Sequence, residues 1–201
     1  MLSDLLDALA DFYAARAAAG DNPMFADVAA ALGDAERDLT GRGATTPPPV
    51  VRWLDHLEPH DDPTIHRIVD AFAALAPSVP WNQTAAYLDA MPPGTTDDYG
   101  YVKILGPDSL APASDVAVGI GVWGPGLHYP MHHHAAEEAY HVLAGHPEFR
   151  TGSGEWRGLA TNESFHQPSW SPHEQRFGDQ PCLLMWAWRG SVADPASLVD
   201  G

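Results

Sequence analysis

The sequence contains few basic residues, a single cysteine and no long apolar run. Lysine and arginine together account for 10 of its 201 residues, against 27 aspartates and glutamates, so the formal net charge is -17. Nucleic-acid phosphates and acidic membrane surfaces would repel such a chain, and we expect neither as a partner. Lys103 is the one lysine. The preference for arginine is typical of genome composition rather than of function.

The single cysteine, Cys182, excludes an intramolecular disulfide framework. It lies in the apolar run CLLMWAW, which predicts a small hydrophobic residue packed in a strand. The first residues, MLSDLLDALADFYAA, carry early aspartates and lack the basic start of a signal peptide. No apolar run is long enough to cross a bilayer. The simplest expectation is a cytoplasmic protein.

Apolar residues recur at helical spacing along the N-terminal half of the chain. The pattern predicts helices over residues 3–19, 23–39 and 63 to about 75, the last with Pro63 at its first helical position. Between them, GRGATTPPP at residues 41–49 is rich in helix-breaking residues and predicts a connection. A short segment is also expected around residues 53–57, and one more helical piece in WNQTAAYLDAM.

From Tyr99 the pattern changes to short β-rich runs separated by Gly, Pro and Asp. These runs are YGYVKILG, DVAVGIGVWG, EEAYHVLAG, PEFRTG, WRGLA and QPCLLMWAWRG. The expected fold is therefore mostly β, with a jelly-roll-like β-barrel over residues 99–201. An N-terminal α-helical region, residues 1–98, is expected to pack on the barrel, and the two parts are expected to form one compact domain.

The most informative segment is GLHYPMHHHAAEEAYHVLAG, which spans residues 126–145. It places Gly126, His132, His134, Glu138 and Gly145 at the spacing G-x5-H-x-H-x3-E-x6-G. This spacing resembles the first metal-binding motif of the cupin β-barrels. Side chains two apart on a strand point to one face, so the two imidazoles can converge. Two imidazoles and a carboxylate suit one divalent transition metal such as Fe, Zn, Mn, Co or Ni.

A further ligand is expected downstream, in ATNESFHQPSWSPHEQRF. There, Pro168 and His173 resemble the second cupin motif, P-x-G-x2-H. Three positions depart from that motif: Asn162 and Trp170 stand where it has glycine, and Phe177 replaces its usual asparagine. These departures concern the geometry of the turn more than the ligand itself.

Two tyrosines stand close to the expected ligands. Tyr140 follows Glu138 by two residues and shares its strand face, and Tyr129 precedes His132 by three. A phenol beside a Lewis-acidic metal can have its pKa lowered enough to act as a base. The alternative is that each tyrosine fills the core with its hydroxyl hydrogen-bonded.

The segments GLHYPMHHHAAEEAYHVLAG and PSWSPHEQRFG are similar to those of the cupin-type dimethylsulfoniopropionate (DMSP) lyases, and within them to the DddQ type. Enzymes of this family occur in marine bacteria and cleave DMSP to dimethyl sulfide and acrylate. The resemblance implies a carbon–sulfur lyase in which His134, Glu138 and His173 bind the metal, with His132 a ligand or an immediate neighbour. It also implies that Tyr140 is a metal-proximal phenolate and the general base. Tyr129 would bind substrate or assist the proton transfer.

The implied β-elimination is compatible with these residue types. A metal that holds the carboxylate of a small zwitterionic sulfonium substrate would stabilise the charge that develops on the neighbouring carbon. Tyr140 would remove the proton from that carbon, and the sulfonium would leave as a neutral thioether. Aromatic faces accommodate a cationic sulfur, and Trp188 and Trp123 are the expected pocket residues.

Two alternatives employ the same ligands: an Fe(II) cupin oxygenase, and a non-catalytic cupin that binds a small molecule, with Tyr129 and Tyr140 merely structural. The Glu-x-Tyr pair together with Tyr129 favours the lyase. The sequence leaves open which metal is bound and whether His132 or Tyr140 completes its shell. It also leaves open whether DMSP is the true substrate, and whether the protein is a monomer or a homodimer.

Overall fold

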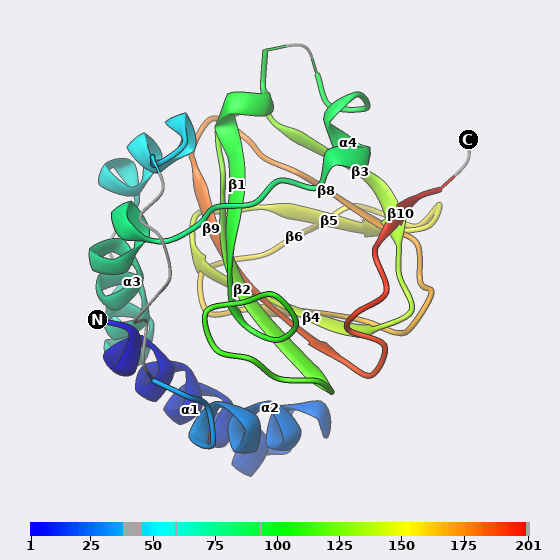
Figure 1. Cartoon of the computed structure of the whole chain (residues 1–201). Helices are drawn as coiled ribbons and strands as arrows, with labels where there is room; N and C mark the ends of the chain where they lie inside the picture. Colours follow the sequence, from blue (N-terminus) through cyan, green and yellow to red (C-terminus); the bar gives the residue numbers. More distant parts are fainter. Residues whose placement is uncertain (38–45, 59, 93, 200–201) are drawn as a thin grey trace.

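The computed structural model describes residues 1–37, 46–58, 60–92 and 94–199. Helices occupy the N-terminal half and strands the remainder (Figure 1). The helical elements are α1 (Leu2–Ala19), α2 (Met24–Gly33), η1 (Pro49–His56), α3 (Pro63–Leu75), η2 (Ala76–Ser78), α4 (Ala85–Leu88) and η3 (Thr96–Asp98). The strands are β1 (Tyr99–Leu105), β2 (Val116–Trp123), β3 (His128–His133), β4 (Glu137–Ala144), β5 (Glu148–Thr151), β6 (Arg157–Gly158), β7 (Ser164–Gln167), β8 (His173–Arg176), β9 (Cys182–Arg189) and β10 (Ser197–Leu198).

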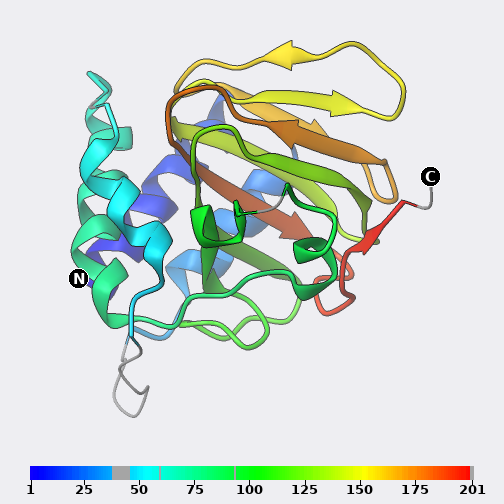
Figure 2. The ribbon, with the colours of Figure 1, turned by 90° about the horizontal axis from the view of Figure 1, so that it is seen from above.

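The strands form two antiparallel five-stranded sheets, in the orders β1-β2-β9-β4-β7 and β10-β3-β8-β5-β6. The sheets enclose a barrel, and α1, α2 and α3 cover the outer face of the first one (Figures 1 and 2). The predicted mostly-β barrel with N-terminal helices packed on it is therefore confirmed. Because β2 lies between the barrel interior and the helices, every one of its residues is buried. This explains why VAVGIGVW is a continuous apolar run instead of an alternating one.

One hydrophobic core joins the helices to the sheet. It contains Leu5 and Leu9 of α1, Phe72 of α3, and Val118 and Ile120 of β2, all fully buried. The predicted start of α3 is correct: the Asp62 carboxylate accepts the backbone N–H groups of the first turn, and a proline follows at the first helical position. No helix in the described ranges has both the length and the apolar character that a membrane span requires.

The predicted extent of the second helix, 23–39, was wrong. Helix α2 ends at Gly33, and Asp34 caps it by donating its backbone N–H to the Ala30 carbonyl. Glycine and aspartate are both poor helix formers, so the pair stops the helix although the apolar spacing continues to Leu39. Residues 38–45, which include that last position and part of the predicted connection at 41–49, lie outside the described residues.

Gly145 and Gly126, the two glycines that bound the first motif, have different structural roles. Both adopt positive φ, +88° and +75° respectively. A Cβ on Gly145 would lie 2.5 Å from the Cys182 sulfur and 2.7 Å from the Pro181 carbonyl oxygen, whereas nothing lies within 4 Å of one on Gly126. Gly145 therefore allows β4 to turn tightly against the start of β9.

We expect Gly145→Ala to lower the free energy of unfolding more than Gly126→Ala. Both variants place a side chain in the left-handed region, at a cost of about 1 kcal/mol. Gly145→Ala adds an overpacking cost of about 1–3 kcal/mol. Urea denaturation of both variants measures the difference, and equal losses would contradict the crowding argument.

His141 shows how β4 alternates between the two faces of its sheet. Its neighbour Tyr140 points into the barrel, whereas the His141 ring packs against Phe12, Tyr13 and Phe25 at centroid distances of 5.0–5.3 Å. Its Nδ1 lies 2.7 Å from the Ser164 hydroxyl. Burial lowers the pKa of His141 to about 3, so this histidine is neutral in the folded protein.

This buried histidine should make folding sensitive to acid. Below its ordinary pKa of about 6.5, the unfolded chain protonates His141 while the folded chain does not, until about pH 3. Unfolding then takes up a proton, so the free energy of unfolding falls as the pH decreases through this window. We expect a shallower fall in His141→Asn, measured by urea denaturation at several pH values between 6.5 and 4. Identical slopes for the two proteins would rule out this contribution.

Candidate active site

Three buried histidines converge inside the barrel. His132 is on β3, His134 follows that strand, and His173 opens β8, where it pairs directly with His132. One nitrogen from each ring lies within 4.8 Å of the others. The strand register thus brings together ligands that are about 40 residues apart in the sequence.

The backbone fixes the tautomer of each histidine. All three Nδ1 atoms lie within hydrogen-bond distance of a backbone carbonyl two residues away, at 2.8–2.9 Å; the carbonyls belong to Pro130, Ala136 and Ser171. Because a carbonyl oxygen only accepts, each Nδ1 must carry the hydrogen and each Nε2 has a free lone pair. Histidines that bind metals through Nε2 are commonly held in this way.

Glu138 completes the cluster from β4. One of its carboxylate oxygens lies 3.0 Å from the Nε2 atoms of both His134 and His173. His173 Nε2 is buried, and its contact with the carboxylate lacks hydrogen-bond geometry. Burial opposes the charge on Glu138. When no metal is bound, the positive charge of protonated His134 and His173, together with the hydrogen bond from His134, outweighs burial and holds the pKa of this carboxyl well below its usual range.

The cluster fits a divalent metal. With hydrogen on Nδ1 only, the Nε2 lone pairs and the carboxylate oxygen would repel one another at 3.0 Å unless a proton or a metal cation lies between them. Neighbouring ligands of one ion, bound at about 2.1 Å, stand about 3 Å apart when their bonds are at right angles. Nitrogen donors with a carboxylate suit the divalent transition metals that the sequence predicted, and the geometry does not select one of them.

Trp188 holds Glu138 in place. It pairs with Glu138 across β4 and β9, and its indole N–H donates a hydrogen bond of 2.6 Å to the second carboxylate oxygen. The indole also stacks on the His134 ring, with centroids 4.2 Å apart and planes 30° apart. Trp188, which the sequence predicted only as a pocket residue, therefore also contacts two of the candidate ligands.

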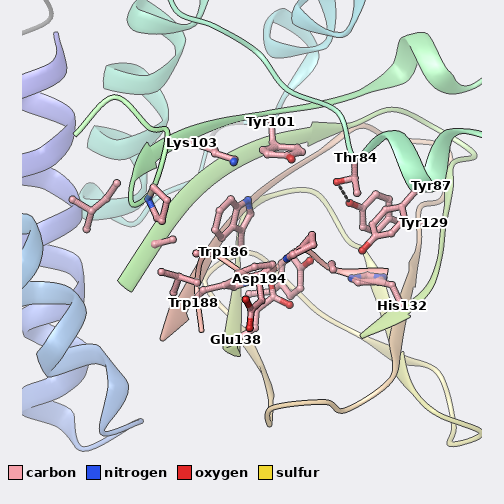
Figure 3. Close-up of a pocket in the computed structure, with 18 of the residues that line it drawn as sticks. Thr84, Tyr87, Tyr101, Lys103, Tyr129, His132, Glu138, Trp186, Trp188 and Asp194 are labelled. Carbon is pink, nitrogen blue, oxygen red and sulfur yellow. Dashed lines mark hydrogen bonds between the residues drawn. The ribbon is translucent and has the colours of Figure 1, made fainter. Parts of the chain in front are cut away.

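A cavity of about 230 Å³ opens beside the cluster. His132, Glu138 and Tyr140 line it, and so do Tyr129 and Trp123. Figure 3 shows Glu138 and His132 on one side of this pocket, and Lys103 and Tyr101 on the other. All the predicted pocket residues thus face one cavity, which the segment 192–196 also borders.

Tyr140 lies next to the candidate ligands but is not ionised by the protein alone. Its ring centroid is 6.2 Å from that of His173. Burial raises the pKa of Tyr140 well above its ordinary value, and the negative charge of Glu138 raises it further. The phenol is therefore neutral unless a cation is bound in the cluster.

Tyr129 belongs to a chain of hydroxyl groups that the sequence did not reveal. Its hydroxyl lies 2.7 Å from that of Tyr99, and the Thr84 hydroxyl lies 3.2 Å from Tyr99. Tyr87, from α4, packs its ring 5.1 Å from Tyr129 and 5.0 Å from His132. These residues lie far upstream of the motif. The signal for Tyr99 was the alternation along β1, which puts Tyr99, Tyr101 and Lys103 on one face.

The residues that replace the two glycines of the second motif have the positive φ that glycine readily adopts. Asn162 and Trp170, which replace glycines, have positive φ values of +70° and +61°. Asparagine tolerates this conformation, whereas for tryptophan it is strained. Trp170 donates its backbone N–H to the carbonyl of His134 at 2.8 Å, which ties this turn to the first motif. Phe177 has become part of the core and stacks on Trp123, with planes 15° apart.

We expect Trp188→Phe to weaken metal binding by about tenfold or more, because the variant loses the hydrogen bond that orients Glu138. Trp123→Phe is the matched control, since the Trp123 indole N–H has no hydrogen-bond partner in the described structure. Competition with a chromogenic chelator for Zn²⁺ or Mn²⁺ measures both affinities. Equal affinities in the two variants would show that this hydrogen bond does not support the metal site.

Comparison with known proteins shows which family this chain resembles. The family model for dimethylsulfoniopropionate lyases matches residues 21–184. The dimethylsulfoniopropionate lyase DddQ of Ruegeria pomeroyi is 40% identical over 81 residues, a stretch that covers 40% of this chain and 40% of that protein.

Solved structures share the whole fold. A crystal structure from a study of the DMSP lyases RdDddP and RnDddQII superposes with a TM-score of 0.83 at 26% identity, over 99% of this chain and 97% of that chain. DddQ from R. pomeroyi superposes with a TM-score of 0.78 at 24% identity, over 98% and 96% of the two chains. The cupin type of barrel predicted from the sequence is confirmed.

Proposed function

The chain belongs to the dimethylsulfoniopropionate lyase family, and on this basis we propose that it cleaves DMSP to dimethyl sulfide and acrylate by a metal-dependent β-elimination. One observation carries the proposal: the cluster of His132, His134, His173 and Glu138 borders the same cavity as Tyr140. A site that combines metal ligands with a phenol suits the removal of a proton next to a carboxylate.

The three histidines and Glu138 would hold one divalent transition metal, with Tyr140 as the further candidate ligand. When bound, such an ion acts as a Lewis acid that holds the substrate carboxylate and stabilises the negative charge developing on the adjacent carbon. Trp188 keeps Glu138 oriented for this task through its hydrogen bond.

Tyr140 is the proposed general base. Its phenolate oxygen accepts the proton from carbon 2 of the substrate, and the electron pair left behind forms the double bond between carbons 2 and 3. The bond from carbon 3 to sulfur breaks, and its electrons stay on sulfur, which leaves as neutral dimethyl sulfide. Since burial and Glu138 raise the pKa of Tyr140, a cation in the cluster is what would make the phenolate accessible.

Tyr129 is proposed to orient the substrate. Burial raises the pKa of Tyr129, so its hydroxyl remains protonated, and the hydrogen bond to Tyr99 fixes its position. Trp123 and Trp188 offer aromatic faces to the sulfonium, which they can approach without a competing carboxylate.

Detection of dimethyl sulfide in the headspace tests this function. The purified protein, loaded in turn with Fe²⁺, Mn²⁺, Co²⁺, Ni²⁺ or Zn²⁺, is given DMSP in air and without oxygen. We expect release in both atmospheres with at least one metal, because the elimination involves no redox change. Tyr140→Phe should lower the rate by about 10²-fold or more, as expected for loss of a general base. His134→Ala should lose both bound metal and activity.

Tyr13→Phe is a matched control for the loss of a phenol, since Tyr13 is buried in the helical core away from the cavity. It should keep its rate within a few-fold of the parent protein. Release only in air would point to an oxygenase. No release with any of the five metals would reject the lyase and favour a non-catalytic binding protein.

A further inference from the structure

Lys103 lines the pocket, on the side opposite Glu138 and His132 (Figure 3). It is half-buried on β1 and is the one lysine of the chain. The composition of the sequence suggested no role for Lys103, whereas its position in the pocket suggests one.

The strand register separates Lys103 from the metal cluster. Lys103 pairs with Gly119 on β2, Gly119 pairs with Trp186 on β9, and Trp186 pairs with Tyr140 on β4. Three strand spacings therefore separate the backbones of Lys103 and Tyr140, or about 14 Å. DMSP has only three bonds between its carboxylate carbon and its sulfur. Bound by that carboxylate at the cluster, it would leave the Lys103 end of the pocket unfilled.

Aromatic side chains line the pocket between the two ends. Gly119 has no side chain, and the Trp186 indole lies over it, since a Cβ there would come within 2.3 Å of the ring. The ring of Tyr101 lies 6.1 Å from that of Trp186. An apolar chain could lie across these side chains from the metal cluster to Lys103.

The charge of Lys103 is not compensated within the described structure. Seven arginines there form ion pairs with carboxylates, whereas Lys103 forms none. Asp194 also lines the pocket, but it is exposed and makes no ion pair with Lys103. An unpaired ammonium group in an aromatic pocket repels a sulfonium and attracts an anion. The Lys103 end of the pocket therefore favours a negatively charged group.

We propose that the Lys103 end of the pocket is an anion subsite, and that the substrates include sulfoniopropionates in which one substituent on sulfur ends in a carboxylate. This inference rests on the proposed function, because the metal cluster must hold the propionate carboxylate. Carbon 2 loses its proton to Tyr140, the double bond forms, and the carbon–sulfur bond breaks with its electrons on sulfur. The products are acrylate and a neutral thioether whose carboxylate pairs with Lys103.

Straight-chain dicarboxylates test the subsite without turnover. Calorimetry compares succinate, glutarate and adipate with the monocarboxylates of equal length, butyrate, valerate and hexanoate, on Zn²⁺-loaded protein. We expect at least one dicarboxylate to bind about tenfold more tightly than its partner, as expected for one charge-assisted hydrogen bond. The advantage should persist in Lys103→Arg and disappear in Lys103→Met. Lys103→Gln serves as a second neutral variant, should the methionine protein fold poorly.

Measurement of turnover is the second part of the test. The ratio of kcat/KM for (carboxymethyl)(methyl)sulfoniopropionate to that for DMSP, followed by acrylate release, should fall about tenfold in Lys103→Met. Equal affinities for di- and monocarboxylates, or an advantage that survives in Lys103→Met and Lys103→Gln, would overturn the subsite. A protein that prefers dicarboxylates but releases no acrylate would support the subsite and reject the lyase, so the two failures are distinguishable.

Discussion

The hydrogen bonds from three histidine Nδ1 atoms to backbone carbonyls are the interaction on which the site depends. Each of them forces the lone pair onto Nε2, and the strands then aim these lone pairs at one point beside the Glu138 carboxylate. Metal-ligand atoms in this arrangement repel one another unless a proton or a metal cation lies between them. Because the acceptors are main-chain atoms, the orientation of the three histidines is part of the barrel itself, whereas Glu138 depends in addition on Trp188.

Side chains pack on both faces of β4. On β4, Glu138 and Tyr140 point inward, whereas His141 points outward into the core formed with α1 and α2. The helical region therefore packs directly behind the strand that carries the proposed base. One core spans helices and sheet, so a disturbance on the outer face would reach the metal side through a single strand.

Local patterns were enough to predict much of this protein. The alternation of strand residues predicted that Glu138 and Tyr140 share a face and that His132 and His134 converge, although His134 lies just beyond β3. Pro63 located the start of α3. Features that depend on pairing between distant strands were not predictable. The hydrogen bond from Trp188 to Glu138 requires the register of β4 with β9, and the position of Lys103 requires that of β1 with β2. The predicted extent of α2 was also wrong, because apolar spacing alone takes no account of the Gly33-Asp34 pair that ends the helix.

Gly119 determines how the size of this pocket would respond to a substitution on β2. The residue does not line the cavity, yet the indole of Trp186 rests where its side chain would be. Any larger residue at this position would push the indole into the open space. The size of the pocket thus depends on a residue of β2 that does not itself line the cavity. A substitution at this single position on β2 would therefore narrow the pocket and leave every candidate metal ligand in place.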